Sequence, residues 1–189
     1  EKVSRIRIKS AKSLARSMKK ALVDLNFIDV AFEISVHSEK DKIGPDGYDQ
    51  AAFMISTNPG EELRPLSQVA SGGELSRIML ALKTVLADKD EIETLIFDEI
   101  DTGISGKTAW KVSEKMGILG QKHQLICITH LPQIAAMADT HFQIEKSVTK
   151  ERTVTRIREL RETESVEELA RMLGGASITE NVLNNAKEM

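Results

Sequence analysis

Two short segments of this chain carry residues whose types and spacing indicate chemistry on a phosphate. Ser71-Gly72-Gly73-Glu74 opens a helical pattern, and Asp98-Glu99 follows an apolar strand pattern further along the chain. The bare N–H groups at a helix start favour an anion. Two adjacent carboxylates at a strand end are suited to holding a metal ion and activating water. This order of groups predicts a site for nucleotide hydrolysis.

The first segment has two interpretations. Ser71 and Glu74 have the spacing of a capping box, in which each side chain accepts a hydrogen bond from a backbone N–H at the helix start. Capping does not explain Gly72 and Gly73, because glycine in a first turn is costly. Two glycines are expected where another group comes close to the backbone, and a phosphate fits that position. We therefore predict that this helix start contacts a phosphate rather than serving only as a cap.

The second segment follows the continuously apolar pattern Thr94–Phe97, which predicts a central strand. Its acids, Asp98 and Glu99, stand at the carboxyl end, where ligands bind in open α/β sheets. Successive strand side chains point in opposite directions, so the two acids are able to serve different tasks. One could hold Mg²⁺ through water while the other activates the attacking water. Two solvated acids at a strand end are the alternative.

Gly106-Lys107-Thr108 resembles the end of a phosphate-binding P-loop, because it stands between a strand pattern and a helix pattern. The full pattern requires glycine five residues before Gly106. That position holds Asp101, whose carboxylate would repel the phosphates. We therefore expect no P-loop here, and a self-contained enzyme that binds nucleotide through Lys107 stays as an alternative.

His130 follows a second apolar strand pattern. A lone histidine after a strand is more often structural. If this strand lies beside the one carrying Asp98 and Glu99, His130 becomes a site candidate that contacts a γ-phosphate or polarises the water. Cys127, inside the apolar run, is expected to be a small core residue rather than a reactive thiol.

The positions of these groups depend on the elements that carry them. The apolar periodicity predicts a helix over 4–25, strands over 30–36 and 50–56, a helix over 73–86, a strand over 94–98, a helix over 105–119, a strand over 124–128, a helix over 131–137, strands over 141–145 and 153–159, and helices over 164–173 and 178–187. The first two strands should pair antiparallel. The β-α-β-α-β alternation from 94 to 145 predicts a parallel sheet covered on both faces. Gly174-Gly175 should end the first of the last two helices.

The first helix is basic, with one narrow apolar stripe formed by Leu14, Met18, Leu22 and Leu25. A single stripe needs a partner, which leaves two interpretations open. The helix is either the last part of a coiled coil or a plain amphipathic helix packed on the domain.

The bulk composition excludes several classes of protein. The 189 residues are 41% hydrophobic and 29% charged, which is ordinary for a globular chain. The net charge of −3 does not by itself predict a nucleic-acid or membrane partner. A single cysteine excludes an internal disulfide framework, and no apolar run is long enough for a membrane span. Glu1 stands inside a helical pattern, so we expect the chain to be part of something longer.

In this order the segments resemble the C-terminal half of an ATP-binding-cassette ATPase head. Ala70–Glu74 resembles the signature motif, Leu95–Glu99 resembles Walker B, Asp101–Ile104 resembles the D-loop, and His130 resembles the switch histidine. Longer segments resemble the RecN family, bacterial DNA-repair proteins of the SMC-like group. They are Thr57–Gly60, Val69–Arg77, Ile96–Gly106, Thr129–Ala135 and Leu169–Gly175.

The resemblance implies a fold and a domain organisation. The fold would be the α/β C-terminal half of a P-loop NTPase head, with a mostly parallel sheet flanked by helices. Residues 1–25 would be the end of a coiled-coil arm, and residues 26–189 the C-terminal lobe of the head. The Walker A and Q-loop motifs that family members carry in an N-terminal half are not in this sequence.

The resemblance also implies partners and roles. ATP and Mg²⁺ would bind between two heads, each completed by its N-terminal half, in a cytoplasmic, nucleoid-associated bacterial protein that repairs DNA double-strand breaks by recombination. No membrane would be involved. The roles are carried over motif by motif. The signature residues Ser71, Gly72, Gly73 and Glu74 would contact the γ-phosphate held by the opposite head. Asp98 would support Mg²⁺, Glu99 would activate water, Asp101 would couple the two sites, and His130 would sense the γ-phosphate.

A third interpretation makes the chain a non-catalytic module. In it the basic first helix binds DNA and the rest is scaffold, so that affinity falls with salt and with loss of its basic residues. The residues concerned are Arg5, Arg7, Lys9 and Lys12. A solvated helix face is the simpler account of these charges.

Overall fold

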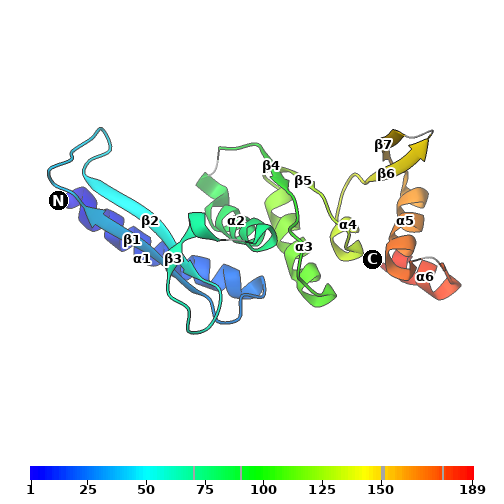
Figure 1. The fold of residues 1–189 in the computed structure, drawn as a ribbon, viewed down its shortest axis with the longest axis horizontal. Helices are drawn as coiled ribbons and strands as arrows, with labels where there is room; N and C mark the ends of the chain where they lie inside the picture. Colours follow the sequence, from blue (N-terminus) through cyan, green and yellow to red (C-terminus); the bar gives the residue numbers. More distant parts are fainter. Residues whose placement is uncertain (70, 90, 150–151, 176) are drawn as a thin grey trace. The chain divides into compact units, whose positions relative to one another are not determined.

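The computed structural model describes residues 1–69, 71–89, 91–149, 152–175 and 177–189. The chain forms two compact units. The first unit contains residues 1–104 and 114–128, and the second contains residues 105–113 and 129–189. Figure 1 labels the elements of both. Among the described helices, none combines the length and the apolar content that crossing a membrane requires.

The first unit begins with a helix laid on a hairpin. Helix α1 (Lys2–Asp24) packs against strand β1 (Ala31–Ser38) and against helix α2 (Gly72–Leu86). Strand β2 (Asp49–Ser56) pairs antiparallel with β1 over its full length, as predicted, and the two-residue strand β3 (Arg64–Pro65) extends this sheet. Two single-turn helices, η1 (Leu66–Gln68) and η2 (Ala87–Lys89), flank α2.

The predicted apolar stripe of α1 is its buried face. Met18, Leu22 and Leu25 are buried and Leu14 is partly so. This unit therefore covers the stripe by itself, as an amphipathic helix packed on a domain requires. The division into a coiled-coil arm over 1–25 and a lobe over 26–189 stays a prediction.

A parallel strand pair follows in the first unit. Strand β4 (Thr94–Phe97) runs parallel to β5 (Gln124–Cys127), and helix α3 (Gly106–Gly120) lies between them in sequence. Leu95 and Phe97 are buried, whereas Ile96 between them is 68% exposed. Ile126 and Ile128 are exposed as well. The prediction of a sheet covered on both faces is therefore wrong for the described residues, because one apolar face stays open.

The prediction that a third strand joins this parallel sheet is also wrong. Strand β6 (Phe142–Thr149) pairs antiparallel with β7 (Arg152–Glu159), and β4–β5 is the only parallel pair among the described residues. The two strands are neighbours in sequence, so their pairing has a low entropic cost and satisfies the backbone groups of β6 locally. The apolar run over 141–145 predicted a strand correctly, but it carried no information on its partner.

The second unit packs its helices around small side chains. Helices α4 (Pro132–Ala135), α5 (Glu162–Gly174) and α6 (Glu180–Glu188) bury a cluster of residues. Its members are Ala135, Leu169, Ala170 and Ala186, with Ala136, Val166, Met172, Val182 and Leu183 packed around them. Gly175 caps α5 with φ 64°, a conformation that glycine adopts without strain, so the predicted helix stop is confirmed.

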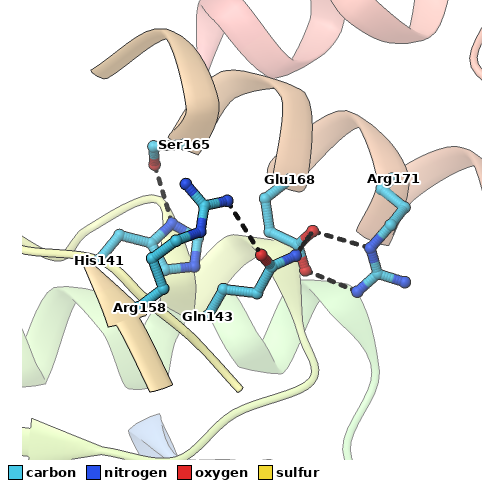
Figure 2. Close-up of polar contacts among 6 residues, drawn as sticks. All are labelled: His141, Gln143, Arg158, Ser165, Glu168 and Arg171. Carbon is cyan, nitrogen blue, oxygen red and sulfur yellow. Dashed lines mark hydrogen bonds and ion pairs between the residues drawn. The ribbon is translucent and has the colours of Figure 1, made fainter. Parts of the chain in front are cut away.

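A polar network connects the β6–β7 hairpin to α5 (Figure 2). The Glu168 carboxylate accepts hydrogen bonds from Gln143 Nε2 at 2.9 Å, Arg171 Nε at 2.8 Å and Arg171 Nη2 at 2.6 Å. Arg158 pairs with Glu164 and donates to Gln143 Oε1 at 3.3 Å. His141 Nδ1 and Ser165 Oγ lie 2.8 Å apart. Hydrogen bonds and an ion pair therefore attach this face of the hairpin to α5.

This network predicts a pH-dependent stability. The hydrogen bonds from Arg171 lower the pKa of Glu168 below its ordinary value, so the ionised form stabilises the fold above that value. Stability falls as the pH drops below about 4.5 and Glu168 takes up a proton. At pH 7, Glu168→Gln should cost about 1–2 kcal/mol in urea unfolding of the chain, because Glu168 is buried while Arg171 is largely exposed.

Glu167→Gln is the matched control, since Glu167 is an exposed neighbour on the same helix. It should change stability by less than about 0.5 kcal/mol. The difference between the two variants should shrink towards pH 3. A difference that is constant across this pH range would contradict the assigned role of the ionised carboxylate.

Candidate functional site

The start of α2 lies directly against the turn that follows β4. A Cβ atom added to Gly73 would lie 2.9 Å from Glu99 O and 3.0 Å from Thr102 O, and one added to Gly72 would lie 2.4 Å from Glu99 Oε2. A side chain at Gly73 would therefore meet backbone, whereas one at Gly72 would meet the movable end of the Glu99 side chain. The close approach that the glycines predicted is confirmed, and the approaching group here is the chain's own turn. Contact with a phosphate stays a prediction.

Ser71 caps α2 through one of the two hydrogen bonds of the predicted capping box. Its Oγ accepts a hydrogen bond from Glu74 N at 3.4 Å, and Ser71 itself has the extended backbone of an N-cap residue. Ser71 and Gly72 are exposed while Gly73 is buried. An anion could therefore reach the helix start at Ser71 and Gly72. Ala70 of the predicted signature motif lies outside the described residues.

The two predicted acids begin a tight turn. Glu99 N donates to Asp98 Oδ1 at 2.9 Å, and Thr102 N donates to Glu99 O at 3.0 Å. Glu99 has φ 56°, the left-handed region that a non-glycine residue seldom adopts. Ser76 Oγ of α2 donates to Asp98 O at 2.7 Å. Both carboxylates are exposed, so this turn presents them to solvent beside the start of α2.

Asp98 fits a magnesium ion that a nucleotide brings with it. Only Oδ1 of its carboxylate accepts a hydrogen bond within the described residues, so Oδ2 is available to the ion or its water shell. No group of three or more potential metal ligands occurs in the part of the chain that the structure describes. The protein alone therefore offers no cage, and Mg²⁺ typically binds through one or two carboxylates together with phosphates and water.

Asp101 of this turn is buried, and Cys127 at the end of β5 is half-buried. Asp101 is 3% exposed, so it is not a solvated loop acid. Burial raises the pKa of the Cys127 thiol to about 12, and the charges of Asp101 and Asp98 raise it further. The raised pKa keeps Cys127 neutral at physiological pH and disfavours a reactive thiol, as predicted, although Cys127 is half-buried rather than a core residue.

His130 belongs to the second unit. It is an exposed loop residue between β5 and α4, just after Thr129, whose Oγ1 accepts a hydrogen bond from Leu131 N at 3.0 Å. Its predicted place beside Asp98 and Glu99 stays a prediction.

The Gly106–Thr108 segment has features unlike those of a P-loop. Gly106 already begins α3, and Thr108 is 4% exposed. A P-loop presents this hydroxyl to Mg²⁺, so its burial disfavours the alternative of a self-contained nucleotide site. Lys107 is exposed.

Two side chains of α2 that contact the turn were not predicted. Ser76 binds the carbonyl of Asp98, and the buried Arg77 donates to Ile100 O and Thr102 O. The sequence did contain a signal for the Arg77 contacts, which is an arginine inside an apolar helical pattern. A buried guanidinium needs backbone or acidic acceptors.

Solved structures identify the class of fold. The chain matches an Smc head domain with a coiled coil and joint from Pyrococcus yayanosii with a TM-score of 0.60 at 18% identity, over 85% of this chain and 29% of that one. A structure from work on ATP-driven dimerization and DNA-stimulated activation of SMC ATPases matches with a TM-score of 0.51 at 16% identity, over 92% of this chain and 99% of that one. The fold is that of an SMC-type head.

Sequence relatives narrow this class. No protein-family model matches the chain. It is 43% identical over 190 residues to the DNA repair protein RecN of Halalkalibacterium halodurans, covering 99% of this chain and 34% of that protein. It is 41% identical over 201 residues to the DNA repair protein RecN of Bacillus subtilis, covering 99% and 35%. The chain belongs to the RecN family and spans about a third of the length of these relatives.

Proposed function

We propose that this chain is the C-terminal half of the ATPase head of a RecN-type DNA-repair protein. The observation that carries the proposal is the contact between the start of α2 and the turn bearing Asp98 and Glu99. A helix start suited to an anion and two exposed carboxylates lie side by side, which is the set of groups that phosphoanhydride hydrolysis uses.

The residues take distinct tasks in this proposal. Ser71 and Gly72 offer the helix start to the γ-phosphate of a nucleotide held by a second head. Asp98 holds the magnesium ion, which supplies charge neutralisation on the phosphates. Glu99 accepts a proton from the attacking water.

Two further roles complete the proposed site. Asp101, buried in the turn, transmits contact between the two heads, and His130 senses the γ-phosphate.

The open apolar face of the β4–β5 pair supports the proposal that an N-terminal half of the head packs against this chain. Ile96, Ile126 and Ile128 remain exposed on this face, and an uncovered apolar sheet face is costly in water. The N-terminal half of the same head, carrying the P-loop, would cover it. The ATP-driven dimerization of the SMC ATPases with this fold supports a second copy as the other partner. By analogy with the bacterial RecN relatives, the proposed location is the cytoplasm, in association with the nucleoid.

The proposal predicts that this chain alone does not turn over ATP. Its sequence carries no Walker A motif, whose amide cradle and lysine would bind the phosphates, so ATP hydrolysis should stay at background. Co-expression with the N-terminal half that carries Walker A should restore turnover, measured as phosphate release. Normal turnover by the isolated chain would overturn the split site. A complete head without any ATP hydrolysis would overturn the proposed function.

DNA is the proposed partner of the complete protein, and the exposed face of α1 supports it. Its basic side chains recur every three to four residues opposite the buried stripe, and the structure gives them no ion pair within the described residues. They are Lys2, Arg5, Lys9, Lys12, Arg16, Lys19 and Lys20. Arg7 is not one of them, because it turns to the hairpin and pairs with Asp49 at 3.0 Å. We call these seven residues the α1 basic face.

Neutralising the α1 basic face should weaken binding to duplex DNA. Replacing Arg5, Lys9, Lys12 and Arg16 by Gln removes up to four phosphate contacts. The slope of log affinity against log salt should then fall by about three to four, measured by fluorescence anisotropy. The control replaces four exposed lysines outside α1, which are Lys40, Lys42, Lys89 and Lys122. Equal losses in the two variants would show a general charge effect and exclude this surface.

A further inference from the structure

Arg77 is a charged residue on the buried side of α2. It is 7% exposed, in the same face as Gly73, Ile78 and Ala81. Taking a guanidinium out of water is costly unless its donors are satisfied, and burial lowers the pKa of Arg77. An apolar residue would fill this position at less cost, so the contacts of Arg77 indicate why an arginine stands there.

Those contacts converge on the turn after Glu99. A single nitrogen, Nη1, donates to Thr102 O at 2.9 Å and to Ile100 O at 3.3 Å. The guanidinium carbon lies 5.5 Å from the centre of the Phe27 ring, which supports it through a cation–π contact. One side chain of α2 therefore holds two carbonyls of this turn.

The turn needs such support. Glu99 has φ 56°, and a residue with a side chain keeps this conformation only when its surroundings hold it. The Glu99 carbonyl lies against Gly73, and Ser76 Oγ donates to Asp98 O. Arg77, Ser76 and Gly73 thus attach the turn to α2 at three points, so that α2 and the Glu99 backbone move together.

We propose that Arg77 is a positioning residue that fixes the direction of the Glu99 carboxylate relative to the start of α2. This inference rests on the proposed function, since it assigns Arg77 to the same ATP site. When the start of α2 contacts a phosphate held by a second head, α2 is fixed relative to that phosphate. Through Arg77, the turn and Glu99 are then fixed relative to it as well. Arg77 contacts no substrate itself, so its loss should affect the rate of hydrolysis rather than the affinity for ATP.

The test uses the full-length protein with Arg77→Met and Arg77→Lys. Methionine keeps a long apolar stem beside Phe27 but donates nothing, so kcat should fall about 10- to 100-fold while KM and the Kd for ATP stay within about twofold. Lysine places one nitrogen near both carbonyls and should recover most of the rate. Arg64→Met, which removes an exposed arginine of the same unit, should leave kcat unchanged.

A double variant separates positioning from simple structural support. In a Glu99→Gln background, Arg77→Met should lower kcat no further, because both changes act through the same carboxylate. Additive losses would overturn the proposal, as would a kcat for Arg77→Met equal to that of Arg64→Met. If Arg77→Met does not fold, Arg77→Gln takes its place in the same comparison. A wild-type protein that hydrolyses no ATP would overturn the proposed function instead.

Discussion

Glu99→Gln is expected to lower the kcat of the complete protein by about 10²- to 10⁴-fold while the affinity for ATP stays within about twofold. Glutamine has the shape of glutamate but cannot accept a proton from water. The Glu99 side chain is exposed and lies over Gly72, so the substitution removes no buried contact. Stability should therefore change by less than about 0.5 kcal/mol. Single-turnover phosphate release and nucleotide binding measure the two quantities separately.

Glu93→Gln is the matched control. Glu93 is an exposed acid before β4, and its backbone carbonyl accepts a hydrogen bond from Gln124 N. Its replacement removes the same charge from the same unit without touching the turn, so kcat should not change. If both variants lose the same fraction of activity, the effect is electrostatic and general. If Glu99→Gln keeps full activity, Glu99 is not the base.

The sequence predicted which segments form elements better than it predicted their partners. The strand over 141–145 was found, but its ladder with β7 was not, because a continuous apolar run fits a parallel or an antiparallel neighbour equally well. The open face at Ile96 was missed for a related reason. Apolar periodicity reports what the complete protein buries, and it does not distinguish burial by this chain from burial by another segment.

The sequence predicted the individual residues of the candidate site but not all of the contacts between them. Ser71 at the N-cap and the acids after β4 lie where the sequence placed them, because capping and strand-end positions depend on local geometry. Arg77 was not found, because its role depends on a turn that lies more than twenty residues after Arg77 itself, and no local pattern encodes that contact. Gly72 and Gly73 were identified because glycine is unfavourable in the first turn of a helix. The group that approaches them, the turn after β4, was not predicted.

Gly73→Ala and Gly72→Ala should have opposite effects on stability. Alanine is favoured over glycine in a helix by about 1 kcal/mol, which alone predicts that both variants are stabilised. At Gly73, however, the new methyl group would meet two backbone oxygens, Glu99 O at 2.9 Å and Thr102 O at 3.0 Å. Backbone does not move without displacing the turn, so overpacking should cost about 1–3 kcal/mol and reverse the sign.

At Gly72 the obstacle is the end of a flexible side chain, Glu99 Oε2 at 2.4 Å. The carboxylate can rotate away, so thermal unfolding of Gly72→Ala should show unchanged or slightly higher stability. Its rotation nevertheless moves the proposed base, and a displacement of about 1 Å costs up to about 10²-fold in rate. Gly72→Ala should therefore be a stable protein with low kcat, and Gly73→Ala should lose both stability and kcat.

The pair of variants distinguishes two reasons for the glycines. If both serve only the approach of a phosphate, Gly73→Ala should be as stable as the wild-type protein and should weaken nucleotide-dependent dimerization. If they serve the turn, Gly73→Ala should melt at a lower temperature even without nucleotide, because the clash lies within the chain. The contact distances favour the second result, since Gly73 is buried against the turn while Gly72 faces solvent.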